Sequence, residues 1–135
     1  FKYLFLHEFG HFFGLNEEYN GGGRTELEFA PEIEEPWSQN ITFLKKPEHI
    51  ALKWNAHVAP EPPLPTPRSM WDNNKPVYGA YVGGYADSQP VGHSHKPGLS
   101  CVMDRGRDFC PVCKSALHHV ISRDLGLIKM RLPNL

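Results

Sequence analysis

The sequence predicts an α+β fold organised around two helices, and three observations predict it. Apolar side chains recur at helical spacing in residues 1–14 and 111–130. Residues 15–100 are instead rich in Gly and Pro and hold only short candidate strands. A tight turn is expected at residues 101–106, just before the second helix. Because 135 residues can bury only a modest core, we expect residues 1–135 to belong to a single domain.

Charge and hydropathy exclude several classes of protein. The formal net charge is −1 and the pI is about 6.8, so the chain lacks the basic footprint of a nucleic-acid or anionic-membrane binder. No apolar run approaches the roughly 18 residues that a membrane-spanning helix needs, and no signal peptide is recognisable. The chain starts at Phe1, inside the first predicted helix. We therefore expect it to be the C-terminal part of a longer domain.

The helix predicted at residues 1–14 carries the zinc-protease signature H-E-x-x-H as His7-Glu8-Phe9-Gly10-His11. A helix advances about 100° per residue, so the two histidines lie one turn apart on one face. Two imidazoles there can share one Zn²⁺, and the Glu beside them can take a proton from a metal-bound water. The pattern predicts His7 and His11 as metal ligands and Glu8 as the catalytic general base.

The side chains around this signature predict a buried helix. After Lys2 the residues are mostly aromatic or Leu, and the polar exceptions, His7, Glu8 and His11, cluster on one side. A buried group of two His and one Glu needs a partner, and a cation is a suitable one. The alternative is an ordinary core helix with a solvated His/Glu edge.

Two glycines and an acidic pair complete the motif. Gly10 is a poor helix former and predicts close approach by another segment, whereas Gly14 suits the residue after a helix end. A turn there would bring Glu17 back towards the metal as the third protein ligand, with Glu18 as the competing candidate. H-E-x-x-H-x-x-G-x-x-E is the metzincin pattern with Glu in place of the third His. It predicts a metzincin-like zinc metallopeptidase catalytic domain.

Three stretches of the loop-rich region predict local structure. Residues 47–57 are expected to form a short amphipathic helix after Pro47. Residues 59–67 contain five prolines and are expected to cross the surface as an ordered, extended loop. Residues 78–85 predict a short hairpin or bulged strand pair, in which the glycines allow positive φ.

Two other stretches bear on the surface. Residues 26–35 hold five glutamates and predict a solvated acidic surface, with a calcium site or a rim that selects basic substrates as the functional alternative. The tripeptide at residues 40–42, Asn-Ile-Thr, matches an N-glycosylation sequon, which has meaning only in a secreted eukaryotic protein.

Two features precede the second helix. His93 and His95 lie in a Gly/Pro-rich loop, where they could bind metal or donate a hydrogen bond to a reacting carbonyl oxygen; the alternative is a pair of exposed histidines without such a role. Among the three methionines, Met103 best fits the turn that forms the apolar floor of a metzincin zinc site.

Three cysteines surround this turn and allow several interpretations. A disulfide from Cys101 to Cys110 or to Cys113 would attach the turn to the last helix and leave one thiol. The rival is a structural zinc site at the three cysteines with His118 or His119 as the fourth ligand. Inert thiols are the third possibility.

Several segments together resemble the IgA-specific metallopeptidase family. They keep the order HEFGHFFGLNEEY, NIT at 40–42, LKW at 52–54, PTP at 65–67, GAYVGGY at 79–85 and CVMDRGRDFCPVCKSAL at 101–117. The C-x-M and F-C-P-V-C pair is more specific than the zinc motif, which many families share. The best-known members are bacterial zinc endopeptidases that are secreted or lie on the cell surface. The resemblance implies a similar location, a protein or peptide substrate, and one catalytic Zn²⁺.

The resemblance also implies roles for individual residues. His7 and His11 would be ligands, Glu8 the general base and Met103 the Met-turn residue. The family's acidic-acidic-Tyr triplet often stands one residue further from the second His, which leaves the choice between the two adjacent glutamates open. Its Tyr-Arg-Pro before the C-x-M is replaced here by residues 95–97, His-Lys-Pro.

The replaced tyrosine bears on activity. If that Tyr stabilises the oxyanion, His95 or Lys96 would substitute for it, or activity would be weakened. The sequence therefore predicts a zinc-dependent endopeptidase. The alternatives are a weak or inactive metallopeptidase-like binding protein, and a Cys/His structural zinc module.

Overall fold

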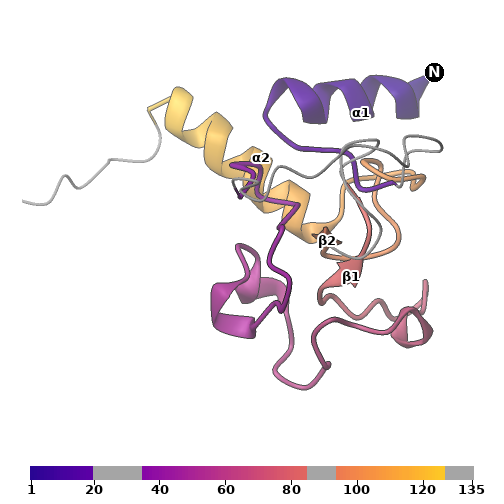
Figure 1. Cartoon of the computed structure of the whole chain (residues 1–135). Helices are drawn as coiled ribbons and strands as arrows, with labels where there is room; N and C mark the ends of the chain where they lie inside the picture. The colour runs from indigo at the N-terminus through magenta and orange to yellow at the C-terminus, as the bar shows by residue number, and fades with distance from the viewer. Residues whose placement is uncertain (20–34, 85–93, 127–135) are drawn as a thin grey trace, which may run out of the picture.

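The computed structural model describes residues 1–19, 35–84 and 94–126 (Figure 1). This part of the chain has two α-helices, a two-stranded antiparallel sheet and three short 3₁₀ turns. The predicted α+β class is confirmed. The elements are α1 (Lys2–Phe12), η1 (His49–Ala51), η2 (Asn55–His57), η3 (Arg68–Met70), β1 (Tyr81–Val82), β2 (His95–Lys96) and α2 (Pro111–Asp124).

The two helices lie in different parts of the molecule. In Figure 1, α1 lies along one edge, and α2 runs obliquely with its N-terminal end beside the sheet. Pro111 occupies the first turn of α2, where its missing N–H leaves no donor unsatisfied. The second helix was predicted to reach residue 130; α2 ends at Asp124, Gly126 follows with φ +67°, and residues 127–130 lie outside the described part of the chain.

The end of α1 is a Schellman motif. The Gly14 N–H donates to the His11 carbonyl at 2.9 Å, and the Leu15 N–H donates to the Gly10 carbonyl at 3.0 Å. Gly14 has φ +88°, a conformation that side chains with a Cβ rarely adopt. The predicted turn at Gly14 is confirmed, and it sends the chain sharply back after the helix.

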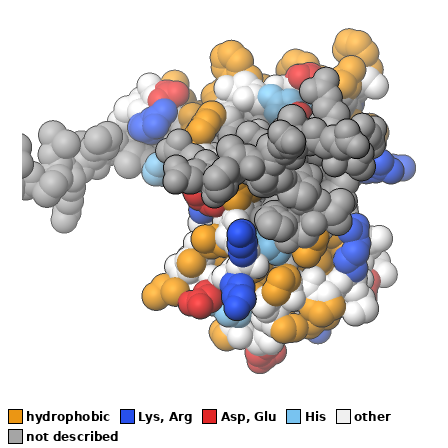
Figure 2. All heavy atoms as spheres, viewed as in Figure 1, with side chains coloured by type: hydrophobic (Ala, Val, Ile, Leu, Met, Phe, Trp, Pro, Cys, Tyr) orange, Lys and Arg blue, Asp and Glu red, His pale blue; other side chains and the backbone are white. Residues whose placement is uncertain are grey.

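The prediction that α1 is a buried helix is wrong for the described part of the chain. Gly10 is its only buried residue, whereas Leu4 is 61% and Phe5 63% exposed. Figure 2 shows hydrophobic side chains along the edge where α1 lies. The physical reason is one-sided packing: the described residues contact α1 through its Gly10 face and leave its other apolar side chains uncovered.

Residues 47–57 do not form the predicted helix. They form η1 and η2, separated by Leu52 in an extended conformation at φ −71° and ψ 130°. Leu52 and Trp54 are both buried in the core, at 3% and 2% exposure. Residues two apart cannot share one helix face but can point inwards from irregular chain. Burial of this pair therefore overrides the local helical pattern.

A strand does form within residues 78–85, but its pairing partner differs from the prediction. β1 does not pair within that stretch but with β2, in the register Tyr81↔Lys96 and Val82↔His95. Thr42 adds an isolated bridge to His95 on the strand's other side. Gly83 and Gly84 do have positive φ, at +125° and +102°. The pairing joins distant segments, which no local pattern could indicate.

The Pro-rich stretch at 59–67 is an ordered loop, as predicted. The Thr66 N–H donates to the Ala80 carbonyl at 2.8 Å, and the Ala80 N–H donates to the Thr66 hydroxyl at 2.9 Å. Most of the acidic run, residues 26–34, lies outside the described part of the chain, as does His93. None of the helices in the described part combines the length and apolarity that crossing a bilayer requires.

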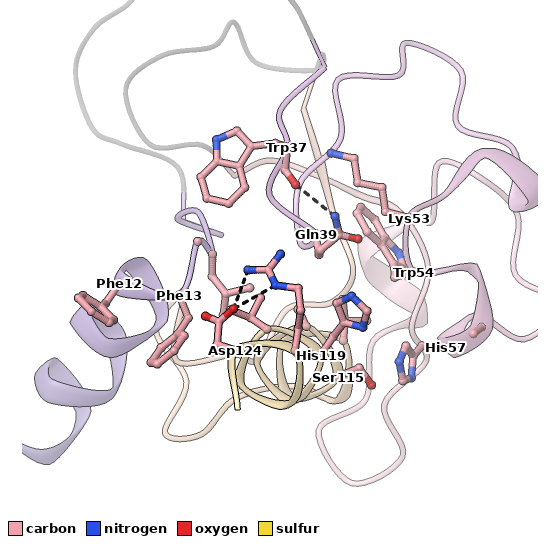
Figure 3. A pocket seen from close by; sticks show the side chains of 17 residues that line it. Phe12, Phe13, Trp37, Gln39, Lys53, Trp54, His57, Ser115, His119 and Asp124 are labelled. Atoms are coloured by element: carbon pink, nitrogen blue, oxygen red, sulfur yellow. Dashed lines mark hydrogen bonds and ion pairs between the residues drawn. The ribbon is translucent and has the colours of Figure 1, made fainter. Parts of the chain in front are cut away.

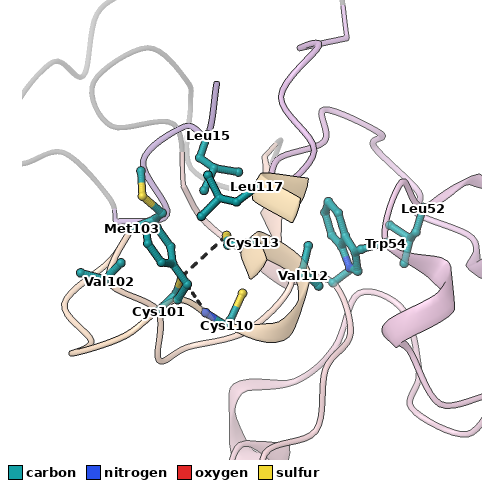
Figure 4. Packing of buried hydrophobic residues seen from close by; sticks show 12 residues of the cluster. Leu15, Leu52, Trp54, Cys101, Val102, Met103, Cys110, Val112, Cys113 and Leu117 are labelled. Carbon is teal, nitrogen blue, oxygen red and sulfur yellow. Dashed lines mark hydrogen bonds between the residues drawn. The ribbon is translucent and has the colours of Figure 1, made fainter. Parts of the chain in front are cut away.

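The core lies where the end of α1, the 101–106 turn and α2 meet. Figure 4 shows Leu15, Met103 and Leu117 packed around the cysteines, with Trp54 on the other side of α2. Met103 is fully buried, and a Cβ added to Gly10 would lie 2.4 Å from its sulfur. Gly10 therefore permits the close approach that the sequence predicts, and the approaching segment is the predicted Met-turn.

Candidate metal centres

Two backbone carbonyls orient the histidines of α1. The His7 Nδ1 lies 2.8 Å from the Val102 carbonyl oxygen, and the His11 Nδ1 lies 2.8 Å from the Leu15 carbonyl oxygen. A carbonyl only accepts, so each Nδ1 carries the hydrogen. In the neutral rings each Nε2 then presents a lone pair. This is the tautomer in which imidazole binds a metal through Nε2.

The two Nε2 atoms face one another at 3.0 Å. Two lone pairs at this distance repel unless a proton or a cation lies between them. The Glu17 Oε1 lies 3.6 Å from the His11 Nε2. Zinc–nitrogen bonds of about 2.0–2.1 Å in a tetrahedron would separate two nitrogens by about 3.4 Å. The structure therefore brings both His7 and Glu17 to the His11 ring, and the binding of one zinc ion by the three side chains stays a prediction.

Local sequence explains how these side chains meet. The turn at Gly14 directs the Leu15 carbonyl onto His11 and brings Glu17 back beside the same ring. The Met-turn approaches from the other side and supplies the Val102 carbonyl to His7. The same turn accepts a 2.7 Å hydrogen bond from the Glu18 N–H at the Met103 carbonyl. The geometry of the His pair thus depends both on the local turn and on a segment far away in the sequence.

The two predicted catalytic side chains lie in different surroundings. Glu8 is exposed on α1, next to His7, where a substrate could reach it. His95 is buried in β2 at 1% exposure, and its backbone exchanges hydrogen bonds of 2.9 and 3.1 Å with Thr42. Its neighbour Lys96 is also buried and donates to the Glu18 carbonyl and to the Asp104 carboxylate. The role of His95 at an oxyanion stays a prediction.

Glu18 lies in a second group, away from the histidines. Its carboxylate is fully buried beside Cys101, Cys110 and Cys113, and one ligand atom from each of the four residues lies within 4.8 Å of all the others. The Cys113 Sγ donates to the Glu18 Oε1 at 3.1 Å. Adjacent glutamates therefore serve two groups, Glu17 at the histidines and Glu18 at the cysteines.

The cysteines are free thiols, although the sequence allowed a disulfide. The Cys101 and Cys113 sulfurs are 3.7 Å apart, and the Cys110 N–H donates to the Cys101 sulfur at 3.3 Å (Figure 4). His118 and His119, the candidates for the fourth ligand of the rival structural zinc site, are exposed on α2. The structure places Glu18 there instead, because their side chains lie on the outer face of the helix.

Burial and mutual hydrogen bonding shift the acidities within this group. Burial, the largest cause, raises the pKa of Glu18 well above its ordinary value, and the neighbouring Cys101 raises it further. The hydrogen bond between Cys101 and Cys110 raises the pKa of Cys101 to about 12 and lowers the pKa of Cys110 to about 5. The arrangement favours one thiolate, at Cys110, held by hydrogen bonds from its neighbours.

Asn40 belongs to this region, and sequence reasoning missed it. Its side chain accepts from the Asn16 N–H at 3.0 Å and donates to the Asn16 carbonyl at 2.7 Å and to the Glu18 Oε1 at 3.1 Å. Asn40 is fully buried, so the sequon at residues 40–42 is not an accessible glycosylation site in the folded protein. The sequon pattern gave no indication of this structural role.

A separate cleft of about 900 Å³ opens between the end of α1 and the outer face of α2. Figure 3 shows Phe12 and Phe13 on one side and Trp54, His57 and His119 on the other. Neither the histidines of α1 nor Glu17 line it. The cleft is large but contains none of these predicted metal ligands. The His pair therefore remains the candidate catalytic centre.

Comparison with known proteins identifies one family. A family model described as IgA Peptidase M64 matches residues 1–76. The matched range contains α1, the His pair and both glutamates of the acidic pair, and it stops before the cysteines. No curated protein matches the chain.

Proposed function

The chain belongs to the IgA peptidase M64 family, as its motifs suggested, and from this premise we propose that it is a zinc-dependent endopeptidase. Membership of a peptidase family supports hydrolysis of peptide bonds in a protein or peptide substrate. The proposed zinc dependence and residue roles are supported by the H-E-x-x-H motif and by the arrangement of its side chains. The observation that carries them is the facing pair of Nε2 atoms on α1, 3.0 Å apart, with Glu17 beside them.

His7, His11 and Glu17 would hold the zinc. When bound, zinc supplies a Lewis acid that polarises the substrate carbonyl and lowers the pKa of a coordinated water. The chain's own contribution is to fix both rings through the Val102 and Leu15 carbonyls, so the ligands are in place before substrate arrives.

Glu8 would move the proton. It is exposed on the same helix, one residue from His7, and a carboxylate there can accept a proton from the attacking water and return it to the leaving amine. His95 would assist the developing oxyanion only if substrate binding gave it access, because its side chain is buried. The proposed general base is therefore accessible to substrate, whereas the proposed oxyanion donor is buried.

The test compares Glu8→Gln with wild type for zinc content and for hydrolysis of an unspecific protein substrate. Gln keeps the size of Glu but cannot accept the proton, so zinc should stay bound while the rate falls about 10²–10⁴-fold. Glu61→Gln, at another exposed glutamate, is the matched control and should keep full activity. Wild-type turnover in Glu8→Gln would remove Glu8 as the base.

One observation favours a second function, a zinc-binding protein with weak or no turnover. Both side chains that could replace the family's tyrosine are buried, His95 at 1% and Lys96 at 3% exposure, and Lys96 is already paired with Asp104. This alternative predicts zinc in wild type and in Glu8→Gln, with no cleavage by either. The same experiment therefore separates the two functions.

Secretion or a location on the cell surface is a proposal that follows from the best-known family members. Cell fractionation tests it directly: we expect the protein in the culture medium or accessible to protease added to intact cells. Recovery only from the interior of lysed cells would contradict it.

A further inference from the structure

The second group contains a buried carboxyl group whose hydrogen bonding the described residues do not complete. The Glu18 carboxylate is fully buried; its Oε1 accepts from Asn40 and Cys113, but its Oε2 has no hydrogen-bond partner among the described residues. An unsatisfied buried carboxylate oxygen carries a large desolvation cost. The cost is removed if a cation occupies the space that the three sulfurs and this carboxylate surround.

We propose that Glu18, Cys101, Cys110 and Cys113 form a structural Zn²⁺ site, separate from the histidines of α1 and independent of whether the protein is an active peptidase. Thiolate, imidazole and carboxylate are the zinc ligands found in proteins, and three sulfurs favour zinc over the hard cations magnesium and calcium. Four protein ligands close the coordination sphere, which is the property of a structural site.

The distances fit this assignment. Zinc–sulfur bonds of about 2.3 Å in a tetrahedron separate two sulfurs by about 3.8 Å, and the Cys101 and Cys113 sulfurs are 3.7 Å apart. The Cys113 sulfur and the Glu18 Oε1 are 3.1 Å apart, and all four ligand atoms lie within 4.8 Å of one another. Small side-chain adjustments would complete the tetrahedron.

The proton balance is simple and needs no co-reactant. Zinc binding releases to solvent the protons that the thiols and the Glu18 carboxyl group still carry, and zinc takes the place of the hydrogen bonds that now join these groups. A disulfide would instead need an oxidant and a sulfur–sulfur distance of about 2.05 Å. The three thiols are free, and the Cys101 and Cys113 sulfurs are 3.7 Å apart. The arrangement therefore favours a metal over a disulfide.

The position of the site suggests what the metal would do. Its ligands come from the segment after α1, from the Met-turn and from the first turn of α2. Glu18 is bonded to the Met-turn through the Met103 carbonyl and directly follows Glu17. Zinc here would hold these three segments together and would fix Glu17 and the Val102 carbonyl beside the histidines. It would thus position the open centre, the name used here for His7, His11 and Glu17, without contacting substrate.

The first test counts thiols and metal. In denaturant with a chelator, three titratable thiols are expected, because zinc sites release their cysteines intact; a single thiol would indicate a disulfide and overturn the proposal. In the native protein we expect zinc to remain in His11→Ala, which removes a ligand of the open centre only. A His11→Ala protein that folds and binds no zinc would also overturn it.

The second test identifies the ligands of the retained metal. Cobalt loaded into His11→Ala should show thiolate-to-cobalt charge-transfer absorption, which a site of His and carboxylate ligands cannot produce. Glu18→Gln should weaken metal retention at this site, because it removes the carboxylate ligand, with Glu61→Gln as the unaffected control. Absence of the charge-transfer band in cobalt-loaded protein would exclude the cysteines as ligands. Failure of the peptidase proposal would leave the band unchanged, so the two failures are distinguishable.

Discussion

The His group on α1 and the Cys group beneath it differ in exposure although they are supplied by neighbouring residues. The side chains of His11 and Glu17 are each 28% exposed, whereas Glu18 and all three cysteines are buried. Three ligands at an accessible position leave room for water and substrate, but four ligands in the core do not. Solvent access, more than the presence of a ligand cluster, therefore separates a candidate catalytic centre from a candidate structural one.

The two groups are also physically linked. Glu18 donates its backbone N–H to Met103 at 2.7 Å, and the residue before Met103 supplies the carbonyl that orients His7. Disturbing the buried group should therefore reach the exposed one through the Met-turn. Disturbing the exposed histidines should affect the buried group less, because His7 and His11 contribute little to the packing of the core.

The largest effect is expected for His11→Ala. This change removes one of the three ligands of the open centre, so its zinc should be lost and hydrolysis should fall to background. Metal analysis and a protease assay measure both quantities. His118→Ala, at an exposed histidine of α2, is the control and should change neither. Full activity in His11→Ala would show that the catalytic role belongs to a different group.

A smaller but clear effect is expected for Gly10→Ala, which tests the contact between α1 and the turn at residues 101–106. The new Cβ would lie 2.4 Å from the buried Met103 sulfur, so overpacking of about 1–3 kcal/mol should outweigh the gain of about 1 kcal/mol from replacing a helical Gly. Urea denaturation should show net destabilisation together with weaker zinc retention at the His pair.

The control for this packing prediction is Leu4→Ala, because Leu4 is 61% exposed on the same helix. It should change stability by no more than about 0.5 kcal/mol. Net stabilisation by Gly10→Ala would mean that the Met-turn does not press against α1.

The pH dependence of the free energy of unfolding should reveal the raised pKa of the buried Glu18. In metal-free protein the folded pKa of Glu18 lies above its ordinary value, so the folded state keeps a proton that the unfolded state releases. The stability from this proton is present below the unfolded pKa and is lost as pH rises towards the folded pKa. Metal-free Glu18→Gln should therefore match wild type at a pH below the ordinary Glu pKa of 4.5 and exceed its stability as the pH rises above that value.

Zinc should reverse the order of stability of wild type and Glu18→Gln. With the metal bound, the ionised Glu18 is a ligand, so wild type should be more stable than Glu18→Gln near about pH 8. Urea midpoints with and without chelator measure the difference. The same order in both conditions would contradict a metal at this carboxylate.

The smallest effect is expected for Lys114→Met, one residue after Cys113. Lys114 pairs with Asp108 at 3.1 Å, but both side chains are more than half exposed, at 56% and 70%. Water and salt screen such a pair, so its loss should cost less than about 1 kcal/mol and leave zinc binding unchanged. Thermal unfolding with metal analysis checks this. A large loss would mean that exposed charges of α2 also hold the buried group.

The sequence by itself determined the features that arise within a few residues. The spacing of His7 and His11 places them on one helix face, Gly14 ends that helix with a positive φ, and Pro111 starts the second helix. These follow from backbone geometry that each segment carries with it. The order of the motifs along the chain likewise indicated the family, which the matching family model confirms.

Only the tertiary structure decided which glutamate joins which group, why Asn40 is buried, that β1 pairs with β2, and that much of α1 stays exposed. Each depends on contacts between segments that lie far apart in the chain. Glu17 and Glu18 are chemically identical and adjacent, so sequence could only leave the choice open. Their environments distinguish them. Glu17 lies beside the partly exposed imidazole of His11, whereas Glu18 is buried in the core beside three cysteines.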